Sequence, residues 1–371
     1  MDIPGLHTLT YQVLWAAFTL SFFFGAIAQR THFCTMGAIS DIVNMGDWTR
    51  MRMWGMAVGI AMIGFFSMAA AGLIDPDKTL YASSRVIWLS ALVGGGMFGF
   101  GMVLSSGCGS KTLVRLGGGS LKSLVVFAIM GIAGFATLKG ITAVARVTTI
   151  DRVALDFNVN ATLPNWLAGV WGIDPSVAGL GLALLIGTAL IIWAVHDQTF
   201  RNLNNLLAGL GIGAVIAAMW WVSGVLGHVA EHPETLQEAF VGTNTGKAEA
   251  MSFVAPMAYT LDWLMFFSDK SKVLTVGVVS VFGVVVGSAA HALATRNFRW
   301  EGFRDVQDTA NHLVGATLMG IGGVTAMGCT IGQGLSGIST LSATSFVAVA
   351  AIVMGCIAGL KYQIWKLERS L

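Results

Sequence analysis

A cysteine and a lysine stand close together in the stretch 104–120, which reads LSSGCGSKTLVRLGGGS. Its SSGCGSKT portion superficially matches a phosphate-binding loop, which needs glycine at the first and sixth positions of GxxxxGK[ST]. Those positions hold Ser105 and Ser110, so the backbone cannot wrap a phosphate as that loop does. The chemistry that remains is that of a thiol, Cys108, followed by Lys111.

The same spacing recurs around a second cysteine. The pattern G-x4-G-x-G-x-V-x3-G-C occurs at 94–108 and again at 315–329, ending on Cys108 and Cys329. The matched residues are Gly94, Gly99, Gly101, Val103, Gly107 and Cys108 in the first copy, and Gly315, Gly320, Gly322, Val324, Gly328 and Cys329 in the second. Six matches in register, ending on two of only four cysteines, predict an internal duplication. Gly109 and Gly332 follow the two copies, so each copy is expected to end in a broken helix.

A third cysteine lies in the motif RTHFCTMG at 30–37. Apolar residues resume after it, which predicts a short re-entrant helix starting near Cys34. A weaker echo at 296–302 places Arg299 where Cys34 would be. The fourth cysteine, Cys356, lies in an apolar run and is expected to be ordinary packing, the usual role of a free cysteine.

Three roles are open to the motif thiols. A nucleophile needs a lowered pKa and usually a base, and the nearest imidazole in sequence is that of His32. A soft-metal site would combine thiolates with methionine, but the eighteen methionines are scattered. The third role is a neutral thiol that donates weakly to a polarisable sulfur or selenium atom. Conduction of an anion favours the neutral thiol, because at ~4 Å two unit charges repel by roughly 4 kcal/mol at an effective dielectric of about 20.

The elements that position these residues must lie in a membrane. Of the 371 residues 55% are hydrophobic and 11% are charged, whereas soluble domains carry about 25% charged residues. The net charge of +2 gives no argument for nucleic acid as a partner. No cysteine pair or cluster predicts a disulfide framework, a metal site or a cofactor.

The chain is therefore expected to be an all-α polytopic membrane protein with about nine transmembrane helices and short re-entrant helices. The predicted spans lie at 11–29, 53–74, 86–106, 119–138, 176–195, 203–227, 273–295, 309–328 and 339–360. A tenth patch, 251–267, contains Pro256 and Asp262 and is expected to be a half-helix or an interfacial segment. Trp220 and Trp221 are expected to lie in the interfacial aromatic belt.

Basic residues in the short loops predict the orientation. They fall on one side if the N-terminus is outside and the C-terminus is cytoplasmic. The acidic loop 228–250, with Glu231, Glu234, Glu238 and Glu249, then lies outside. The single membrane domain 1–371 divides into a first repeat half, 11–139, and a second, 176–361. The segments 140–175 and 228–272 are extramembrane or interfacial connections.

On this assignment the two glycine–cysteine motifs end at opposite membrane faces, so the two halves form an inverted pseudo-two-fold repeat. Such repeats with broken helices are typical of transporters, in which the substrate path lies at the repeat interface. The N-terminus of a broken helix presents free N–H groups and a positive dipole end, which suit an anion.

The stretches FCTMGAISD, SGCGSKTLVRLGGGSLKSL and MGCTIGQGLSGIST resemble the YeeE/YedE family of bacterial membrane proteins for sulfur-compound transport. The resemblance covers roughly 20–360. It implies an inverted-repeat helical fold in the bacterial inner membrane and uptake of thiosulfate or a related sulfur or selenium species past path cysteines, the positions held here by Cys34, Cys108 and Cys329. Members that take up thiosulfate typically have a further path cysteine in the second half, and this chain has no cysteine between 108 and 329.

We therefore expect a non-enzymatic permease for thiosulfate or a related anion, with a cytoplasmic sulfur-acceptor protein as a further candidate partner. The predicted path contains the three motif cysteines with Gly107, Gly109, Gly328, Lys111 and Gln333, and further candidates are Arg299, His291 and His312. The alternatives are a selenium-species or sulfite transporter of the same fold, and a membrane sulfurtransferase or redox protein that uses Cys108 as a persulfide carrier.

Overall fold

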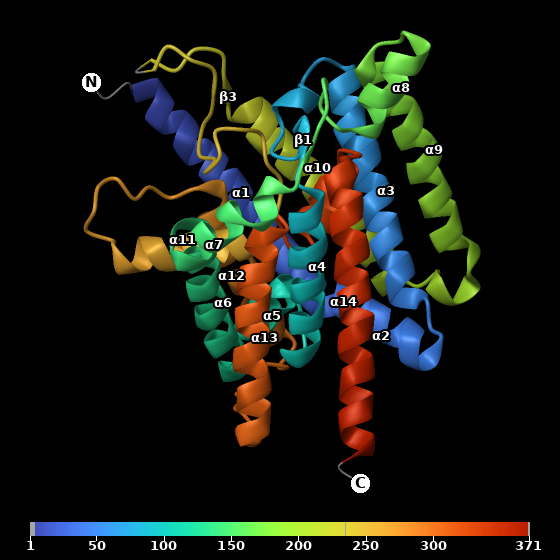
Figure 1. Ribbon diagram of the computed structural model, residues 1–371, viewed down its shortest axis with the longest axis vertical. Helices are drawn as coiled ribbons and strands as arrows, with labels where there is room; N and C mark the ends of the chain where they lie inside the picture. The colour runs from blue at the N-terminus through green and yellow to red at the C-terminus, as the bar shows by residue number, and fades with distance from the viewer. Residues whose placement is uncertain (1–3, 234, 370–371) are drawn as a thin grey trace.

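The structure is a computed structural model that describes residues 4–233 and 235–369, and its regular elements are mainly helices (Figure 1). The long helices are α1 (Pro4–Thr31), α3 (Thr49–Ala70), α4 (Trp88–Leu104), α6 (Leu121–Lys139), α9 (Pro175–His196), α10 (Leu203–Trp221), α12 (Val276–Ala294), α13 (Val306–Thr325) and α14 (Ala343–Glu368). Glu234, one of the acids used above for the orientation, lies outside the described residues.

Shorter elements connect or interrupt these helices. They are α2 (Thr35–Met45), α5 (Gly109–Gly117), α7 (Ile141–Thr148), α8 (Leu163–Trp171), α11 (Val254–Met265), the 3-10 turns η1 (Pro76–Lys78), η2 (Ile150–Arg152) and η3 (Gln198–Phe200), and the π-helical segments η4 (Val222–Leu226) and η5 (Gly332–Gly337). Strands β1 (Arg85–Val86) and β2 (Leu155–Asp156) form one antiparallel pair, and β3 (His228–Val229) and β4 (Ala239–Phe240) form another.

Within the part of the chain that the structure describes, eight helical segments are long and apolar enough to cross a membrane. They are Gly5–Met45, Thr49–Ala70, Trp88–Gly117, Leu121–Lys139, Pro175–His196, Leu203–Leu226, Val276–Ala294 and Ala343–Glu368. The all-helical membrane fold is thus confirmed. The remaining predicted span, 309–328, forms α13, which is not among the eight because the polar residues Asp308, Asn311 and His312 lower the hydropathy of its first turns.

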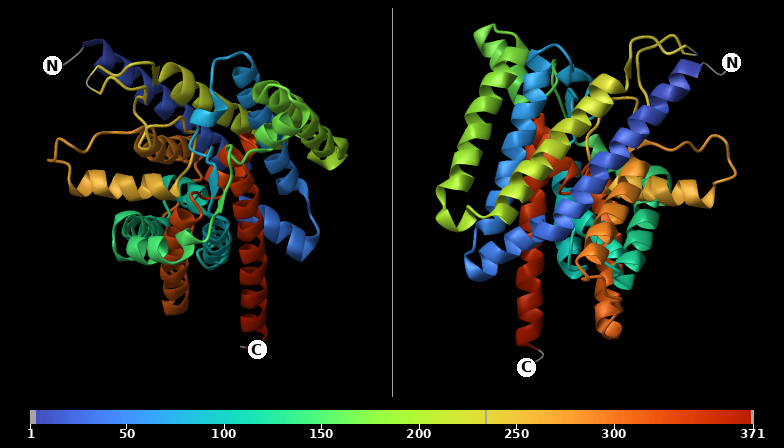
Figure 2. Two further views of the ribbon diagram at one scale, coloured as in Figure 1. Left: turned by 45° about the horizontal axis from the view of Figure 1, so that its top comes forward. Right: turned by 180° about the vertical axis from the view of Figure 1, so that it is seen from behind.

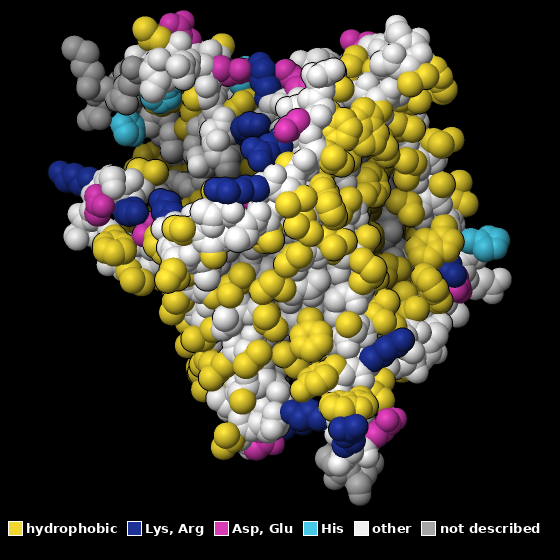
Figure 3. Space-filling model, in the orientation of Figure 1, with side chains coloured by type: hydrophobic (Ala, Val, Ile, Leu, Met, Phe, Trp, Pro, Cys, Tyr) yellow, Lys and Arg dark blue, Asp and Glu magenta, His cyan; other side chains and the backbone are white. Residues whose placement is uncertain are grey.

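Hydrophobic side chains cover the middle of the visible face, and most charged side chains lie towards its two ends (Figure 3). The start of α1 and the end of α14 lie at opposite ends of the long axis (Figure 1). Helix α11 lies across the direction of the long helices in both views of Figure 2. It occupies most of the tenth hydrophobic patch, which is therefore helical but short, as predicted.

Helices α4 and α13 pack tightly because glycines of the two motifs face each other. A Cβ on Gly94 would lie 2.7 Å from the carbonyl oxygen of Gly322, and a Cβ on Gly322 would lie 2.6 Å from that of Gly94. Gly101 and Gly315 show the same reciprocal relationship, at 2.7 and 2.6 Å. The residue order is reversed between the two helices, so α4 and α13 run antiparallel.

Each of the two motifs also packs against a second helix. Gly99 of α4 lies against the backbone of Ile352 in α14, whereas the equivalent Gly320 of α13 lies against the backbone of Met130 in α6. Helix α13 therefore packs between α4 and α6. Protein rather than lipid surrounds much of α13, which explains how a less apolar helix is accommodated in the bundle.

The prediction for Trp220 is wrong. This side chain is fully buried, its ring packs against Phe65 and Tyr81, and its Nε1 donates a hydrogen bond to Ser339 Oγ at 3.0 Å. The adjacent Trp221 is 44% exposed, as a belt residue requires. Neighbouring positions on a helix face different directions, and the dipeptide alone does not show which one points inward.

Candidate functional site

Each of the three motif cysteines stands at the start of a short helical segment. Cys34 is the N-cap of α2, and its Sγ accepts a hydrogen bond from the backbone N–H of Gly37 at 3.4 Å. Cys108 is the N-cap of α5. Cys329 precedes η5, and its Sγ accepts a hydrogen bond from Gly332 N–H at 3.4 Å. The thiols of α2 and α5 thus lie where helix N-termini favour negative charge.

The two breaks that follow α4 and α13 have the same backbone geometry. Ser106 and Met327, which occupy equivalent motif positions, adopt left-handed conformations with φ of 56° and 57°. The closing hydrogen bonds are also equivalent: Ser106 N–H donates to Val103 O, Gly107 N–H to Met102 O, Met327 N–H to Val324 O and Gly328 N–H to Gly323 O. The repeated sequence spacing therefore folds into a repeated local structure.

The three thiols gather in the interior of the bundle. The side chains of Cys34 and Cys108 lie next to each other, and Cys329 lies within electrostatic range of Cys108. Cys108 Sγ also lies 3.3 Å from Ser110 Oγ. Cys34 is 8% exposed, and Cys108 and Cys329 are fully buried. Neutral hydrogen-bonding groups, rather than a paired base, are thus the immediate surroundings of the thiols.

Two cations accompany the first pair of thiols. Lys111, in the first turn of α5, lies within electrostatic range of Cys34 and Cys108. Arg50 of α3 contacts the backbone of Gly37, where a Cβ would overlap its guanidinium, and forms an ion pair with Asp41 at 3.2 Å. Positive charge therefore lies beside the thiols without pairing directly with them.

A polar cavity of about 200 Å³ adjoins the end of α4. Ser105, Ser106 and Gly107 form part of its wall, and further side chains come from α5, α6 and the start of α13. We call this cavity the polar cavity. It reaches the helix break next to Cys108.

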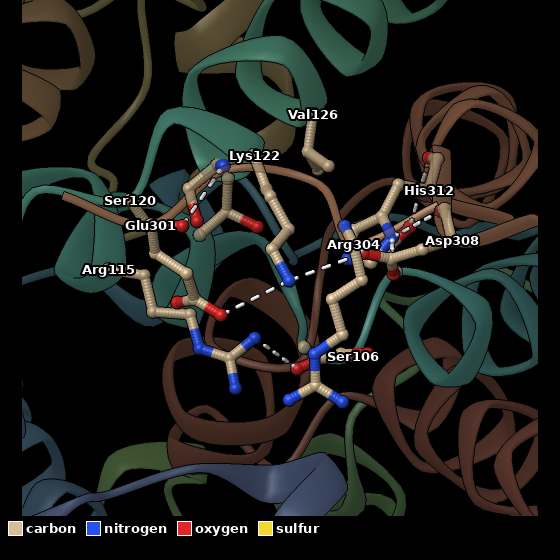
Figure 4. Close-up of a pocket in the computed structure, with 13 residues that line it drawn as sticks. Ser106, Arg115, Ser120, Lys122, Val126, Glu301, Arg304, Asp308 and His312 are labelled. Carbon is tan, nitrogen blue, oxygen red and sulfur yellow. Dashed lines mark hydrogen bonds and ion pairs between the residues drawn. The ribbon is translucent and has the colours of Figure 1, made fainter. Parts of the chain in front are cut away.

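Figure 4 shows how charges are arranged in the polar cavity. Lys122 Nζ lies between two carboxylates, 3.1 Å from Glu301 and 3.3 Å from Asp308. Arg115 donates to the carbonyl oxygen of Ser106 at 2.8 Å. Within residues 4–233 and 235–369, neither Arg115 nor Arg304 forms an ion pair, so the cavity has cationic groups that are not neutralised.

A second cavity of about 200 Å³ adjoins the end of α13. Met327 and Gly328 belong to its wall, and so do Glu249 and Tyr259. We call it the Glu249 cavity. Glu249 is 9% exposed, its carboxylate accepts a hydrogen bond from Thr245 Oγ1 at 3.4 Å, and burial raises its pKa to about 7.

The two cavities lie at opposite ends of one helix pair. The polar cavity adjoins the C-terminal end of α4, the Glu249 cavity adjoins the C-terminal end of α13, and these helices are antiparallel. Cys108 follows the first end and Cys329 follows the second. The buried thiols therefore lie between the two cavities.

The predicted glycines and Gln333 shape the breaks. Gly107 lies against Lys111, and Gly328 lies against Gln333. Gln333 is 1% exposed; its Nε2 donates to Ala326 O at 2.7 Å, and its Oε1 accepts a hydrogen bond from Ser345 Oγ at 2.6 Å. Both ends of this amide are thus engaged in bracing the second break against α14.

The three further candidates make their contacts with groups other than the thiols. His312 is buried in the wall of the polar cavity, where its Nδ1 lies 2.7 Å from Asp308 O. His291 is half-buried on α12, within range of His32. Arg299 is exposed, and its backbone N–H donates to Gly118 O at the far end of α5 from Cys108. The structure does not bring Arg299 to the cysteines.

Several residues of this region were not singled out in the sequence. Lys122 and Arg304 are each only a basic residue of a short loop in the sequence, because the contact between the start of α6 and the start of α13 is long-range. Thr35 and Thr330 directly follow Cys34 and Cys329, and this shared Cys-Thr pair was a visible signal. Glu249 belongs to the predicted acidic loop, and nothing in the sequence around it indicates that its side chain is buried.

A family model described as Sulphur transport matches residues 30–358. The thiosulfate transporter TsuA of Escherichia coli (strain K12) is 28% identical over 341 residues, which cover 89% of each chain. The thiosulfate transporter TsuA of Spirochaeta thermophila is 24% identical over 360 residues, which cover 92% of this chain and 97% of the relative. The matched region contains all three motif cysteines.

Proposed function

The chain belongs to the Sulphur transport family, and on this premise we propose that it is a permease that carries thiosulfate or a closely related sulfur-containing anion across the membrane. One observation carries the proposal: three buried thiols lie between two cavities at opposite ends of the α4–α13 pair. The names of the two relatives support thiosulfate as the substrate.

The thiols act in this proposal as a relay of weak donors. Thiosulfate has a terminal sulfur atom that is soft and polarisable, and a neutral S–H group can donate to it. Each contact is weaker than an ion pair, so the anion leaves one position as readily as it enters it, which is what conduction requires. Lys111 offsets the negative charge at the Cys34–Cys108 position without holding the anion by direct pairing.

We also assign an inverted repeat to the two halves, 11–139 and 176–361. The antiparallel packing of α4 and α13 supports it, as do the reciprocal glycine contacts and the equivalent hydrogen bonds at the two breaks. The exchange of partners, α4 with α14 and α13 with α6, is the relationship that a pseudo-two-fold axis produces. A path between inverted halves opens to the two membrane faces by related movements.

The proposed orientation places the polar cavity on the cytoplasmic side, because its lysine and arginine side chains follow the positive-inside rule. The Glu249 cavity then opens towards the outside of a bacterial inner membrane. Substrate enters past Glu249 and leaves past Arg115 and Arg304, where a cytoplasmic sulfur-acceptor protein would collect it.

Uptake into proteoliposomes tests the function. Labelled thiosulfate should enter vesicles that contain the unaltered protein, and the Cys108→Ala and Cys329→Ala variants should lose most of this uptake. Cys356→Ala is the matched control, since Cys356 is a buried thiol of α14 outside the motifs. Wild-type rates in both path variants would reject the relay.

A competition panel of sulfite, sulfate and selenite against labelled thiosulfate defines the cargo. Strong competition by selenite alone or by sulfite alone would favour the alternative function, a transporter of selenium species or of sulfite with the same fold. A stable mass increase of about 32 Da on Cys108 after exposure to substrate would instead indicate a persulfide carrier.

A further inference from the structure

Four buried polar side chains near the three thiols have no hydrogen-bond partner within the described residues. They are Thr35, Trp54, Tyr81 and Thr330, whose unpaired atoms are three hydroxyl oxygens and one indole nitrogen. Only seven buried side-chain nitrogen or oxygen atoms of the described chain are unpaired, so the majority belong to this small region. An unpaired buried polar group costs about 1–3 kcal/mol, and such a concentration requires a physical reason.

The positions of these groups follow the cysteines. Thr35 is next to Cys34. Thr330 is next to Cys329 and lies beside the Cys108 thiol, but its hydroxyl makes no hydrogen bond of acceptable geometry. Their exposed fractions are 6% for Thr35 and 2% for Thr330. Both hydroxyls therefore flank the predicted relay and are shielded from solvent.

Thr35, Thr330 and Trp54 line one small cavity of about 60 Å³. Gly334 of η5 belongs to the same wall, and a Cβ there would lie 2.9 Å from the Trp54 ring, so the absence of a side chain admits the indole. The free surface of this cavity is apolar, so in this conformation the three unpaired atoms lie behind its wall.

Tyr81 is the fourth unpaired group, and it lies between the other three and the Glu249 cavity. Its side chain is 6% exposed and lies within electrostatic range of both Cys329 and Glu249. Burial raises its pKa well above the ordinary value, so the phenol stays protonated and can donate. The unpaired groups thus extend from the thiol pair to the second cavity.

We propose that Thr35, Trp54, Thr330 and Tyr81 bind the oxygen atoms of the transported anion while the cysteine thiols contact its terminal sulfur. The inference deepens the proposed function and rests on it. It names the substrate class as a sulfur oxyanion with one soft end and one oxygen-bearing end, so an anion that has only one of these ends engages half of the path.

Neutral donors suit this task better than cations do. Hydroxyl and indole N–H groups replace part of the hydration shell of the oxygen atoms, yet they add no full charge that would trap a dianion. In a low-dielectric interior each such hydrogen bond is stronger than in water. The path thereby discriminates between anions by the geometry of its donors, with the net charge supplied by Lys111 and the cavities.

The test compares uptake of labelled thiosulfate with uptake of labelled hydrosulfide, which lacks oxygen atoms. Thr35→Val and Thr330→Val remove a hydroxyl at nearly constant volume, and each should raise the KM for thiosulfate about tenfold, as expected for the loss of one hydrogen bond. Hydrosulfide uptake should be unchanged in both variants, and Thr330→Ser should restore the thiosulfate KM.

Thr137→Val is the matched control, because Thr137 is a fully buried threonine whose hydroxyl already donates to Ala133 O at 2.7 Å. Wild-type KM values in Thr35→Val, Thr330→Val, Trp54→Phe and Tyr81→Phe, together with loss of uptake in Cys108→Ala, would overturn the oxygen site and leave the permease intact. Equal losses for thiosulfate and hydrosulfide would also overturn it. Absence of thiosulfate uptake by the unaltered chain would overturn both proposals.

Discussion

The thiol of Cys34 and the thiol of Cys108 lie next to each other, although one residue caps α2 and the other caps α5. Two helix starts from separate parts of the first half therefore converge on one position. Both residues are buried, so this pair forms a constriction that any anion on the proposed path must pass.

Oxidation of the protein in proteoliposomes should join Cys34 and Cys108 in an intrachain disulfide and stop uptake. The physical reason is proximity: added hydrogen peroxide oxidises one thiol to a sulfenic acid, the neighbouring thiol attacks that sulfur and displaces its oxygen as water, and the new bond would fix α2 to α5. Mass spectrometry of peptides should show the linked pair with a loss of about 2 Da, and a reductant should restore uptake. Cys34→Ala should abolish the link, whereas Cys356→Ala should preserve it; continued uptake by fully cross-linked protein would contradict the prediction.

The stability of the folded protein should fall as the pH rises, because Glu249 has a raised pKa. Burial raises its pKa to about 7 from an ordinary value of 4.5, so between these values the folded chain binds a proton that the unfolded chain releases. Stability is thus fully present below the lower value and declines as the pH rises towards 7. The neighbours of this carboxyl are Tyr81, Tyr259 and Arg146, and they stay the same in a Glu249→Gln variant.

Thermal unfolding in detergent measures this effect. Glu249→Gln should melt several degrees above the unaltered protein at pH 8, and the two should converge near pH 5. Glu231→Gln, at an exposed position of the same loop, is the control and should change little at either pH. A difference that grows towards acid pH would show that the sign is wrong.

The glycine contacts between α4 and α13 should be intolerant of even one methyl group. Gly94→Ala and Gly322→Ala would each place a Cβ within 2.7 Å of the facing carbonyl oxygen, and overpacking of this kind costs about 1–3 kcal/mol. Gly181→Ala in α9 meets no atom within 4 Å and should stabilise the helix by about 0.5–1 kcal/mol. Melting temperatures and yields of folded protein distinguish the two classes, and equal behaviour would argue against close packing at the motif.

The sequence predicts the backbone of the site better than it predicts the side-chain contacts of the site. The spacing of Gly107, Cys108, Gly328 and Cys329 indicates two helix breaks, because glycine adopts the irregular backbone conformations found where a helix ends. The structure has a break at each position, with equivalent hydrogen bonds.

The contacts around the thiols could not be predicted because they are long-range. Nothing local to Cys34 indicates that it meets Cys108, and nothing local to Lys122 indicates Asp308 as its partner. Asp308 and His312 also made α13 less apolar than the other spans, and only its position between α4 and α6 explains how it fits. Burial of Glu249 likewise depends on neighbours from distant segments.

Arg115 and Arg304, the arginines of the polar cavity that form no ion pair within the described residues, should affect the binding of anions from that side of the membrane only. The charge of Lys122 is neutralised by Glu301 and Asp308, so the positive charge of the cavity comes from the two arginines. Arg304→Gln and Arg115→Gln each remove one of these charges. Each variant should raise the KM for thiosulfate added to the cavity side about threefold to tenfold at low salt. The difference should shrink as ionic strength rises, since the Debye length is about 10 Å at 0.1 M salt.

Vesicles of both orientations separate this effect from a general loss of activity, because KM measured from the Glu249 side should stay near the wild-type value. Arg201→Gln is the matched control: Arg201 is an exposed arginine whose Nε donates to Val195 O at 2.7 Å, outside the polar cavity. If Arg201→Gln had the same effect as Arg304→Gln, bulk surface charge would explain the change. If only the cavity variants respond, and only from one face, Arg115 and Arg304 attract the anion at that mouth.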